Sequence, residues 1–245
     1  MRVALTGSRG FIGSHVKTHL ESLGCTVDEW DLKIDKPINQ IILHKDTEYV
    51  IHLAAFADVR ESIREPQKYW DNNVTPTTAI QEYCHKLDIP LLYASSSCIH
   101  QWHLSPYGMS KKINEETAYE NQVGLRFTTV YGEGARDEML IGRLLDGRVS
   151  YLTDHIRDFI HVSDVVMAIS LLMRHDLTEL KPAYDIGTGK GVIVSDLGVL
   201  AGFDIDIKPG DSCEAYCNTA NINDMLDLGF EAAIDIEEYI KENRK

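Results

Sequence analysis

The chain has 245 residues, of which 44% are hydrophobic and 25% charged, and 24 basic against 38 acidic side chains give it a formal net charge of −14. This composition is typical of a globular protein with one large or two small domains, and it excludes collagen-like, low-complexity and disordered chains. No apolar run reaches the roughly 18–20 residues that a membrane-spanning helix needs. We therefore expect no membrane partner, and the negative charge argues against nucleic acid, which binds concentrated basic surfaces.

The cysteines and the start of the chain predict a cytoplasmic protein. The first residues read as a strand rather than as a secretory signal. Five cysteines are an odd number scattered over a long chain, which fits a reducing compartment better than a disulfide framework. Cys213 and Cys217 have no further Cys or His pair nearby to complete the four ligands of a structural zinc ion, so we expect no metal.

Short apolar runs alternate with longer periodic segments through the first two thirds of the chain. The runs that predict buried strands are residues 3–5, 26–30, 49–53, 91–94 and 125–130. The periodic segments that predict helices are residues 12–23, 72–86, 106–121, 137–145, 164–174 and 236–243. Strands separated by helices imply parallel pairing with right-handed crossovers, so the predicted fold class is α/β, a doubly wound parallel sheet of the Rossmann type.

A glycine-rich turn follows the first predicted strand and opens the first predicted helix. Gly7 permits the tight turn, Gly10 lets backbone N–H groups approach a pyrophosphate, and Gly13 lets helix and strand pack closely. Asp31 ends the next predicted strand, where a carboxylate binds the ribose hydroxyls of a dinucleotide. Arg9 is a candidate for neutralising the extra phosphate of NADP, but Asp31 would repel that phosphate, so the pattern favours NAD.

The character of the sequence changes after about Tyr131, where short irregular pieces rich in Gly, Asp and Pro begin. We interpret residues 1–131 as mainly an NAD-binding Rossmann domain. Residues 132–245 are then mainly a small substrate-binding lobe, with some segments expected to return to the sheet.

A second group of polar residues follows the strand at residues 91–94. Ser96 lies directly after this strand, and Tyr107 and Lys111 are four residues apart, so they share one face of a helix. An unperturbed tyrosine has a pKa of about 10, and a lysine ammonium beside it, with the cationic nicotinamide, would favour the phenolate. The pattern predicts an acid–base site in which Ser96 orients the same substrate oxygen.

The motifs together resemble one known family, the extended short-chain dehydrogenase/reductases, in the nucleotide-sugar epimerase/dehydratase group. The matching segments run in order over nearly the whole chain: His52-Leu53-Ala54-Ala55, Asn73-Val74, Ser95-Ser96-Ser97, Pro106-Tyr107 with Lys111, Leu125-Arg126 to Val130-Tyr131-Gly132, Arg157-Asp158-Phe159-Ile160-His161-Val162 with Asp164, and Tyr184-Asp185-Ile186-Gly187 with Gly189.

The resemblance implies a role for individual residues. The cofactor-binding residues would be Gly7, Arg9, Gly10, Phe11, Ile12, Gly13, Asp31, Leu53, Ala54, Ala55, Tyr107 and Lys111. The catalytic residues would be Ser96, Tyr107 and Lys111, and the substrate, a nucleotide-diphosphate sugar, would be bound by Ser97, Cys98 and Arg157. A planar guanidinium suits the diphosphate because it binds phosphate oxygens bidentately. The family also implies a homodimer formed through the helices at residues 72–86 and 106–121.

Several features depart from the family pattern. The stretches between Asp31 and residue 49 and between Ser97 and Tyr107 are short, and His100 stands where an aromatic residue is usual. Cys98 and Ile99 also resemble a Ser-Ser-Cys-Ile segment of GDP-sugar 3,5-epimerases and fucose synthases, in which the cysteine is an acid/base group. Its usual histidine or lysine partner is not recognisable here.

We interpret the chain as an NAD-dependent enzyme that epimerises a nucleotide-activated sugar, at C4 and through a transient 4-keto intermediate. Tyr107 would take the proton of the 4-hydroxyl while the C4 hydride passes to the nicotinamide. The alternative within the enzymes is a 3,5-epimerase or 4-keto-sugar reductase that uses Cys98. An alternative of another class is a catalytically silent nucleotide-binding module.

Overall fold

A computed structural model describes residues 1–36, 40–203 and 206–244. Its centre is a six-stranded sheet with the spatial order β2-β1-β3-β4-β5-β9, and every neighbouring pair of strands is parallel. These strands are β1 (Arg2–Thr6), β2 (Thr26–Trp30), β3 (Tyr49–His52), β4 (Leu91–Ser96), β5 (Gln122–Phe127) and β9 (Ala183–Ile186). The doubly wound parallel sheet predicted from the sequence is confirmed.

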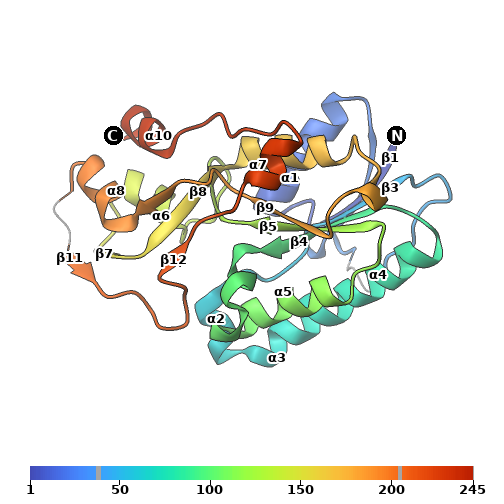
Figure 1. The fold of residues 1–245 in the computed structure, drawn as a ribbon, viewed down its shortest axis with the longest axis horizontal. Coiled ribbons are helices and arrows are strands. Elements are labelled where there is room, and N and C mark those ends of the chain that lie inside the picture. Colours follow the sequence, from blue (N-terminus) through green and yellow to red (C-terminus); the bar gives the residue numbers. More distant parts are fainter. Residues whose placement is uncertain (37–39, 204–205, 245) are drawn as a thin grey trace.

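Helices cover both faces of this sheet. Figure 1 shows α1 (Phe11–Ser22) and α7 (Val162–Leu172) on one face, and α4 (Thr75–Lys86) and α5 (Pro106–Glu116) on the other. Successive strand residues point to opposite faces. Val3 and Leu5 therefore belong to the core cluster that contains α1 and α7, whereas Ala4 packs in the cluster that contains α4.

The parallel pairing places the ends of three strands at one edge. Thr6 at the end of β1 is in register with His52 at the end of β3, and His52 is in register with Tyr93 of β4. Ligands of open parallel sheets bind at the carboxyl ends of the strands, near the point where the strand order reverses. β1 and β3 flank that point here because β2 follows β1 outward on one side and β4 follows β3 on the other.

Short elements connect these strands and helices. They are the 3₁₀ turns η1 (Leu32–Ile34), η4 (Ser97–Leu104) and η5 (Leu177–Glu179), the helices α2 (Val59–Arg64) and α3 (Pro66–Tyr69), and the π-helical turn η3 (Trp70–Val74). In the described residues between β2 and β3, η1 is the only regular element. Among the described residues β2 is consequently the edge strand, and none of them forms the strand that lies beyond it in the common dinucleotide-binding order.

The remaining elements build a smaller lobe, drawn on the left of Figure 1. Strand β8 (Ile156–His161) is central and pairs with β6 (Thr129–Tyr131), β10 (Gly191–Ile193) and β12 (Cys217–Asn218), while β7 (Tyr151–Thr153) pairs with β11 (Asp206–Lys208). The helices of this part are α6 (Leu140–Leu145), α8 (Val194–Leu200) and α10 (Ile236–Asn243). β9, α7 and the short helix α9 (Asn223–Asp227) instead pack with the main sheet and its covering layer.

Four predicted elements were wrong in their extent. The strand predicted at residues 125–130 is two strands, because Thr128 donates its N–H to the Ile186 carbonyl and the chain then leaves the main sheet to pair with β8 as β6. The helix predicted at 106–121 ends at Glu116, and the one predicted at 137–145 begins at Leu140. The helix predicted at 72–86 begins with the π-helical turn and becomes α-helical at Thr75.

Among the described residues, no helix has both the length and the apolar character needed to cross a bilayer.

His52 is expected to make stability depend on pH. Its ring nitrogens bond the hydroxyls of Thr6 (2.6 Å) and Thr77 (2.8 Å), and burial, with the nearby Lys111, lowers its pKa to about 3. The unfolded chain binds the extra proton below its ordinary pKa of about 6.5, so stability is fully present above that pH and is lost as pH falls toward 3. We expect urea unfolding to show a loss of up to about 1.4 kcal/mol per pH unit in this window. The slope of unfolding free energy against pH should be shallower in His52→Gln and unchanged in the exposed control His103→Gln. Equal slopes in the wild type and both variants would refute the role of His52.

Candidate active site

The glycine-rich turn packs directly against the segment that follows β3. Gly7 has a φ of +70°, and a Cβ there would lie 2.7 Å from the Ala54 nitrogen. A Cβ on Gly13 would lie 2.0 Å from the Gly7 carbonyl oxygen, so only glycine lets α1 begin this close to the turn. Thr6 joins the two segments, because its carbonyl accepts the Leu53 N–H (3.2 Å) and its hydroxyl accepts the Ala54 N–H (3.2 Å).

The remaining predicted cofactor residues border this turn. Phe11 and Ile12 form the first residues of α1, partly buried against the core, and Ala55 follows Ala54 in the loop after β3. Gly10 caps the helix, with its N–H bonded to the Gly7 carbonyl (2.9 Å). This is a helix N-terminus whose amides and positive dipole end suit a pyrophosphate.

Asp31 lies beside the turn, as the spacing predicted. Its two carboxylate oxygens accept the N–H groups of Arg9 (2.9 Å) and Lys33 (2.8 Å). The Arg9 guanidinium forms an ion pair with Glu29 (2.8 Å), so its charge is already countered. Carboxylates at the end of β2 suit ribose hydroxyls better than an additional phosphate. The residues of this edge therefore fit NAD.

Ser96, Tyr107 and Lys111 come together at the end of β4. Ser105 caps α5 by accepting the Gly108 N–H (3.0 Å), which sets the helix so that Tyr107 and Lys111 lie one turn apart. The Ser96 hydroxyl lies close enough to the Tyr107 phenol to favour its ionised form, and the Lys111 ammonium is 5.8 Å from the centre of the Tyr107 ring. Lys111 also donates to the Ala94 carbonyl at 2.8 Å.

Burial dominates the electrostatics of this group. It raises the pKa of the Tyr107 phenol above its usual value, and the neighbouring Cys98 adds to the rise. It lowers the pKa of Lys111 to about 8. The sequence predicts that Lys111 together with a nicotinamide cation favours the phenolate. In the protein without cofactor, loss of hydration is the larger effect and the phenol keeps its proton.

Ser97 and Cys98 begin η4 beside this group. Ser97 is buried, and the Cys98 N–H donates to the Ser96 hydroxyl at 3.2 Å. Burial raises the pKa of the Cys98 thiol, while its hydrogen bond to Ser96 and the positive charge of Arg157 act in the opposite direction. The thiol is therefore protonated at neutral pH and lies close enough to Arg157 to sense its charge.

Arg157 is held in place on β8 by several acceptors. One amino group donates to the carbonyls of Ala215 (2.8 Å) and Ile156 (2.9 Å), and the other donates to His155 Nδ1 (2.9 Å) and the Glu214 carboxylate (3.0 Å). The guanidinium that the resemblance implied as a diphosphate ligand is thus paired with a carboxylate of the same chain.

Four residues near the site were missed by the sequence analysis. The Ser62 hydroxyl on α2 accepts the Tyr107 N–H at 3.2 Å, and Arg136 acts electrostatically on the Tyr107 phenol. Arg60 on α2 forms an ion pair with Glu214 at 2.7 Å. Arg60 and Ser62 follow closely after the predicted cofactor loop, which was a usable signal, whereas Arg136 and Glu214 lie in irregular segments without a pattern.

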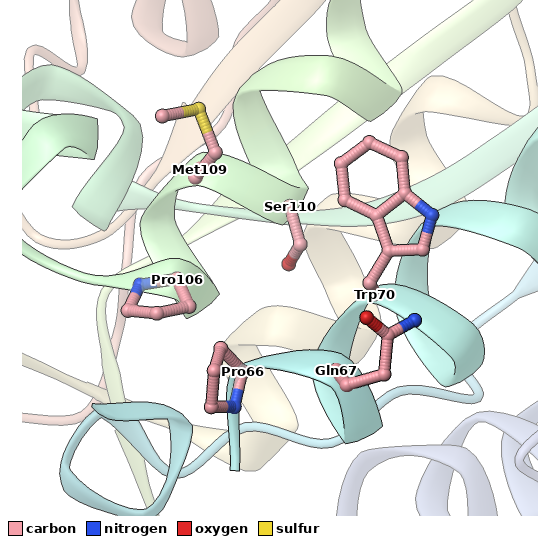
Figure 2. Close-up of a pocket in the computed structure, with 6 residues that line it drawn as sticks. All are labelled: Pro66, Gln67, Trp70, Pro106, Met109 and Ser110. Atoms are coloured by element: carbon pink, nitrogen blue, oxygen red, sulfur yellow. The ribbon is translucent and has the colours of Figure 1, made fainter. Parts of the chain in front are cut away.

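A surface cavity of about 240 Å³ lies apart from these residues. It is lined by Pro66 and Gln67 of α3, Trp70 of η3, and Pro106, Met109 and Ser110 of α5 (Figure 2). None of the predicted catalytic residues lines it.

Comparison with known proteins assigns the chain to a family. The sequence model described as the NAD dependent epimerase/dehydratase family matches residues 3–187. The chain belongs to this family. It is therefore an NAD-dependent enzyme of the epimerase type with the Rossmann fold.

Several relatives of the family are similar over almost their whole length. Protein CapI of Staphylococcus aureus is 27% identical, with 98% of this chain and 96% of that protein covered. A UDP-glucose 4-epimerase of Pisum sativum is 26% identical, with 98% and 94% covered. Among solved structures, MoeE5 in complex with UDP-glucose and NAD is 28% identical, with a TM-score of 0.82 and 100% of this chain and 97% of that chain covered.

The chain is compact for this family. The alignment with Protein CapI extends over 324 positions, so at least 79 of them (324 less 245) have no residue in this chain. The short connection between β2 and β3 and the brief η4 before α5 are consistent with the two short stretches noted in the sequence.

The burial of Lys111 predicts that the enzyme without cofactor gains stability when this charge is removed. The lysine has a pKa of about 8 when folded and about 10.5 when unfolded, so the cost of burying the charge is complete below pH 8 and disappears as pH rises to 10.5. We expect Lys111→Met to raise the unfolding free energy by about 1–2 kcal/mol at pH 7, after the lost bond to Ala94 is offset. The gain should vanish near pH 10.5.

Denaturant unfolding of the cofactor-free protein at several pH values measures this difference. Lys112→Met is the matched control, because the neighbouring side chain is 35% exposed and pairs with Glu116 on the helix surface. A Lys111→Met protein no more stable than the wild type at pH 7 would show that the buried ammonium carries no such cost.

Proposed function

We propose that the chain epimerises a nucleotide-activated hexose at C4 through a transient 4-keto sugar. The observation that carries this proposal is the convergence of Ser96, Tyr107 and Lys111 at the strand edge that also holds the glycine-rich turn. Similarity supports the choice of C4, since relatives from Pisum sativum and Methanocaldococcus jannaschii bear the names UDP-glucose 4-epimerase and putative UDP-glucose 4-epimerase. The UDP-glucose and NAD bound to MoeE5 support the substrate class.

The side chains divide the chemistry between them. NAD, which Gly7, Asp31 and the loop after β3 would hold, would supply the acceptor and donor of the hydride at C4. Tyr107 takes the proton of the 4-hydroxyl and gives it back, and the Ser96 hydroxyl holds the same oxygen. The Lys111 ammonium, which donates to the Ala94 carbonyl, would contact the nicotinamide ribose and would stabilise the Tyr107 phenolate before it takes the proton.

The division of the chain follows from these roles. We infer that residues 1–131 mainly hold NAD, through Gly7, Asp31 and the loop after β3, and that residues 132–245 mainly hold the substrate. Ser97 and Cys98 would border the sugar, and Arg157 of β8 would bind the diphosphate. β9, α7 and α9 are the exceptions, because all three pack with the main sheet.

Chemistry at C4 is favoured over the neighbouring carbons because the sequence offers no recognisable histidine or lysine partner for Cys98. Burial raises the pKa of this thiol as it does that of the Tyr107 phenol, so the missing partner rather than the pKa separates the two interpretations. A silent nucleotide-binding module is disfavoured because nothing structural requires Ser96, Tyr107 and Lys111 together.

A homodimer and a cytoplasmic location stay predictions. We propose that a second copy covers the cavity on α3 and α5, where Trp70 is 49% and Met109 38% exposed. The cytoplasm fits because all five cysteines are unpaired.

Substitution of Tyr107 tests the acid–base role. We expect Tyr107→Phe to lower turnover of UDP-glucose by about 10²- to 10⁴-fold, because the hydroxyl that moves the proton is removed. NAD affinity should change less than about threefold, whereas Lys111→Ala should weaken both turnover and NAD binding because the ammonium also contacts the cofactor. Retention of most activity in Tyr107→Phe would exclude the assignment.

Turnover in heavy water separates C4 epimerisation from chemistry at Cys98. The hydride that leaves and returns to C4 does not exchange with water. Mass spectrometry of the product should therefore show no carbon-bound deuterium. A thiol that removes a proton beside the ketone would exchange it with solvent and leave deuterium at C3 or C5. Incorporation that is lost in Cys98→Ser would favour the 3,5-epimerase alternative instead.

A further inference from the structure

Two arginines from different parts of the fold hold the two oxygens of one carboxylate. Arg60 lies on α2, Arg157 lies on β8, and Glu214 lies in the irregular segment that precedes β12. Arg60 Nε is 2.7 Å from Glu214 Oε1, and Arg157 Nη2 is 3.0 Å from Glu214 Oε2. Asp211 is farther away, with an oxygen 3.8 Å from Arg60 Nε. The Glu214 carboxylate therefore bridges two guanidinium groups.

The place where the Glu214 carboxylate lies between Arg60 and Arg157, called the anion site below, borders the proposed catalytic residues. The charges of Arg157 and Glu214 both act on the Cys98 thiol, which follows directly after Ser96 and Ser97. From the other side, Ser62 lies two residues after Arg60 on α2 and its hydroxyl accepts the Tyr107 N–H. One ligand could therefore place an anionic group where the Glu214 carboxylate lies and a sugar beside Tyr107.

Arg157 is organised independently of the Glu214 side chain. Its guanidinium is 12% exposed and donates to backbone carbonyls of β8 and of residues 215 and 216, and to the His155 ring. Burial and the Arg157 charge lower the pKa of His155, so at neutral pH the ring nitrogen accepts this bond. Rotation of the Glu214 side chain alone would free the site and leave Arg157 in position.

Two guanidinium groups around one carboxylate suit a ligand of higher charge. A diphosphate carries more negative charge and more acceptor oxygens than a carboxylate, and the planar guanidinium matches phosphate oxygens bidentately. The ion pair of Arg60 is weak because its side chain is 46% exposed, so solvent screens this half of the bridge. The carboxylate can thus be replaced from the solvent side.

We propose that Arg60 joins Arg157 in binding the diphosphate of the nucleotide sugar, and that Glu214 occupies this site until the diphosphate displaces it. The inference rests on the proposed function. Because the diphosphate binds only molecules in which Glu214 has turned away, its apparent affinity is reduced by the fraction of molecules in that state. Neutralising Glu214 should remove this reduction.

Calorimetric titration of the NAD-loaded, full-length protein with UDP tests the displacement. Glu214→Gln keeps the side-chain shape and removes the charge, so we expect UDP to bind at least about fivefold more tightly. Glu242→Gln, a surface change on α10, is the matched control and should leave the affinity unchanged. Glu214→Asp keeps the charge but shortens the side chain, so a smaller gain is expected; thermal unfolding verifies that each variant is folded.

Arg60 is tested in the Glu214→Gln background, where no competing carboxylate remains. Adding Arg60→Gln should weaken UDP binding at least about fivefold, and adding Arg64→Gln on the exposed side of the same helix should not. UDP affinity that is unchanged or weaker in Glu214→Gln would overturn the displacement. A loss from Arg60→Gln seen with UDP-glucuronic acid but not with UDP would overturn the diphosphate assignment, because Arg60 would then bind a sugar carboxylate.

Inorganic pyrophosphate separates this inference from the proposed function. It probes the two guanidinium groups without a base or a sugar, so the same order of affinities among the variants is expected. If pyrophosphate reproduces this order while no nucleotide sugar is bound or converted, the anion site stands and the proposed function fails. If nucleotide sugars are converted but Glu214→Gln leaves pyrophosphate and UDP affinity unchanged, the displacement fails and the proposed function stands.

Discussion

The close contact between Gly7 and the backbone at Leu53 and Ala54 is the constraint on which the site depends. No side chain fits there, since a Cβ on Gly7 would lie 2.7 Å from the Ala54 nitrogen. The contact brings the turn after β1 against the loop after β3, and Thr6 secures it with two hydrogen bonds. His52 extends the same link by bonding the Thr6 hydroxyl, so cofactor loop and sheet are fixed as one unit. The helix amides that suit a pyrophosphate are positioned by backbone packing rather than by a flexible loop.

Burial of the two proposed acid–base residues, Tyr107 and Lys111, disfavours their charged forms and so lowers the stability of the folded protein. Lys111 is 2% and Tyr107 8% exposed, and burial shifts both pKa values toward the neutral forms. Such shifts are typical of functional sites, where groups are held in an environment that suits a reaction rather than the resting protein. The phenol therefore keeps its proton until positive charge arrives beside it. In the proposed mechanism the positive charge of a bound nicotinamide would favour the phenolate, so the protonation state that the reaction needs would depend on the cofactor.

Most of the sheet could be predicted from the sequence because the information is local. The runs at residues 3–5 and 49–53 are apolar or β-branched except for His52, and their observed counterparts β1 and β3 agree within a residue at each end. The prediction of one strand at residues 125–130 was wrong because the break depends on distant partners. The Ile186 carbonyl accepts the Thr128 N–H, and the next residues pair with β8. Apolar periodicity does not report where one sheet gives way to another.

The same limit explains which site residues were found. Short spacings along the chain identified the pairs Gly7 and Gly13, and Tyr107 and Lys111. The bond between Arg60 and Glu214 instead joins residues 154 positions apart, which no local pattern reveals. The physical need behind that bond was nevertheless visible in the net charge of −14. An acidic protein repels a nucleotide diphosphate at long range, so recognition has to come from a few guanidinium groups placed close to the ligand. The Arg157 guanidinium, 12% exposed, would be costly to leave without a counter-charge between turnovers, and a carboxylate supplied by the protein itself provides that charge until the substrate arrives.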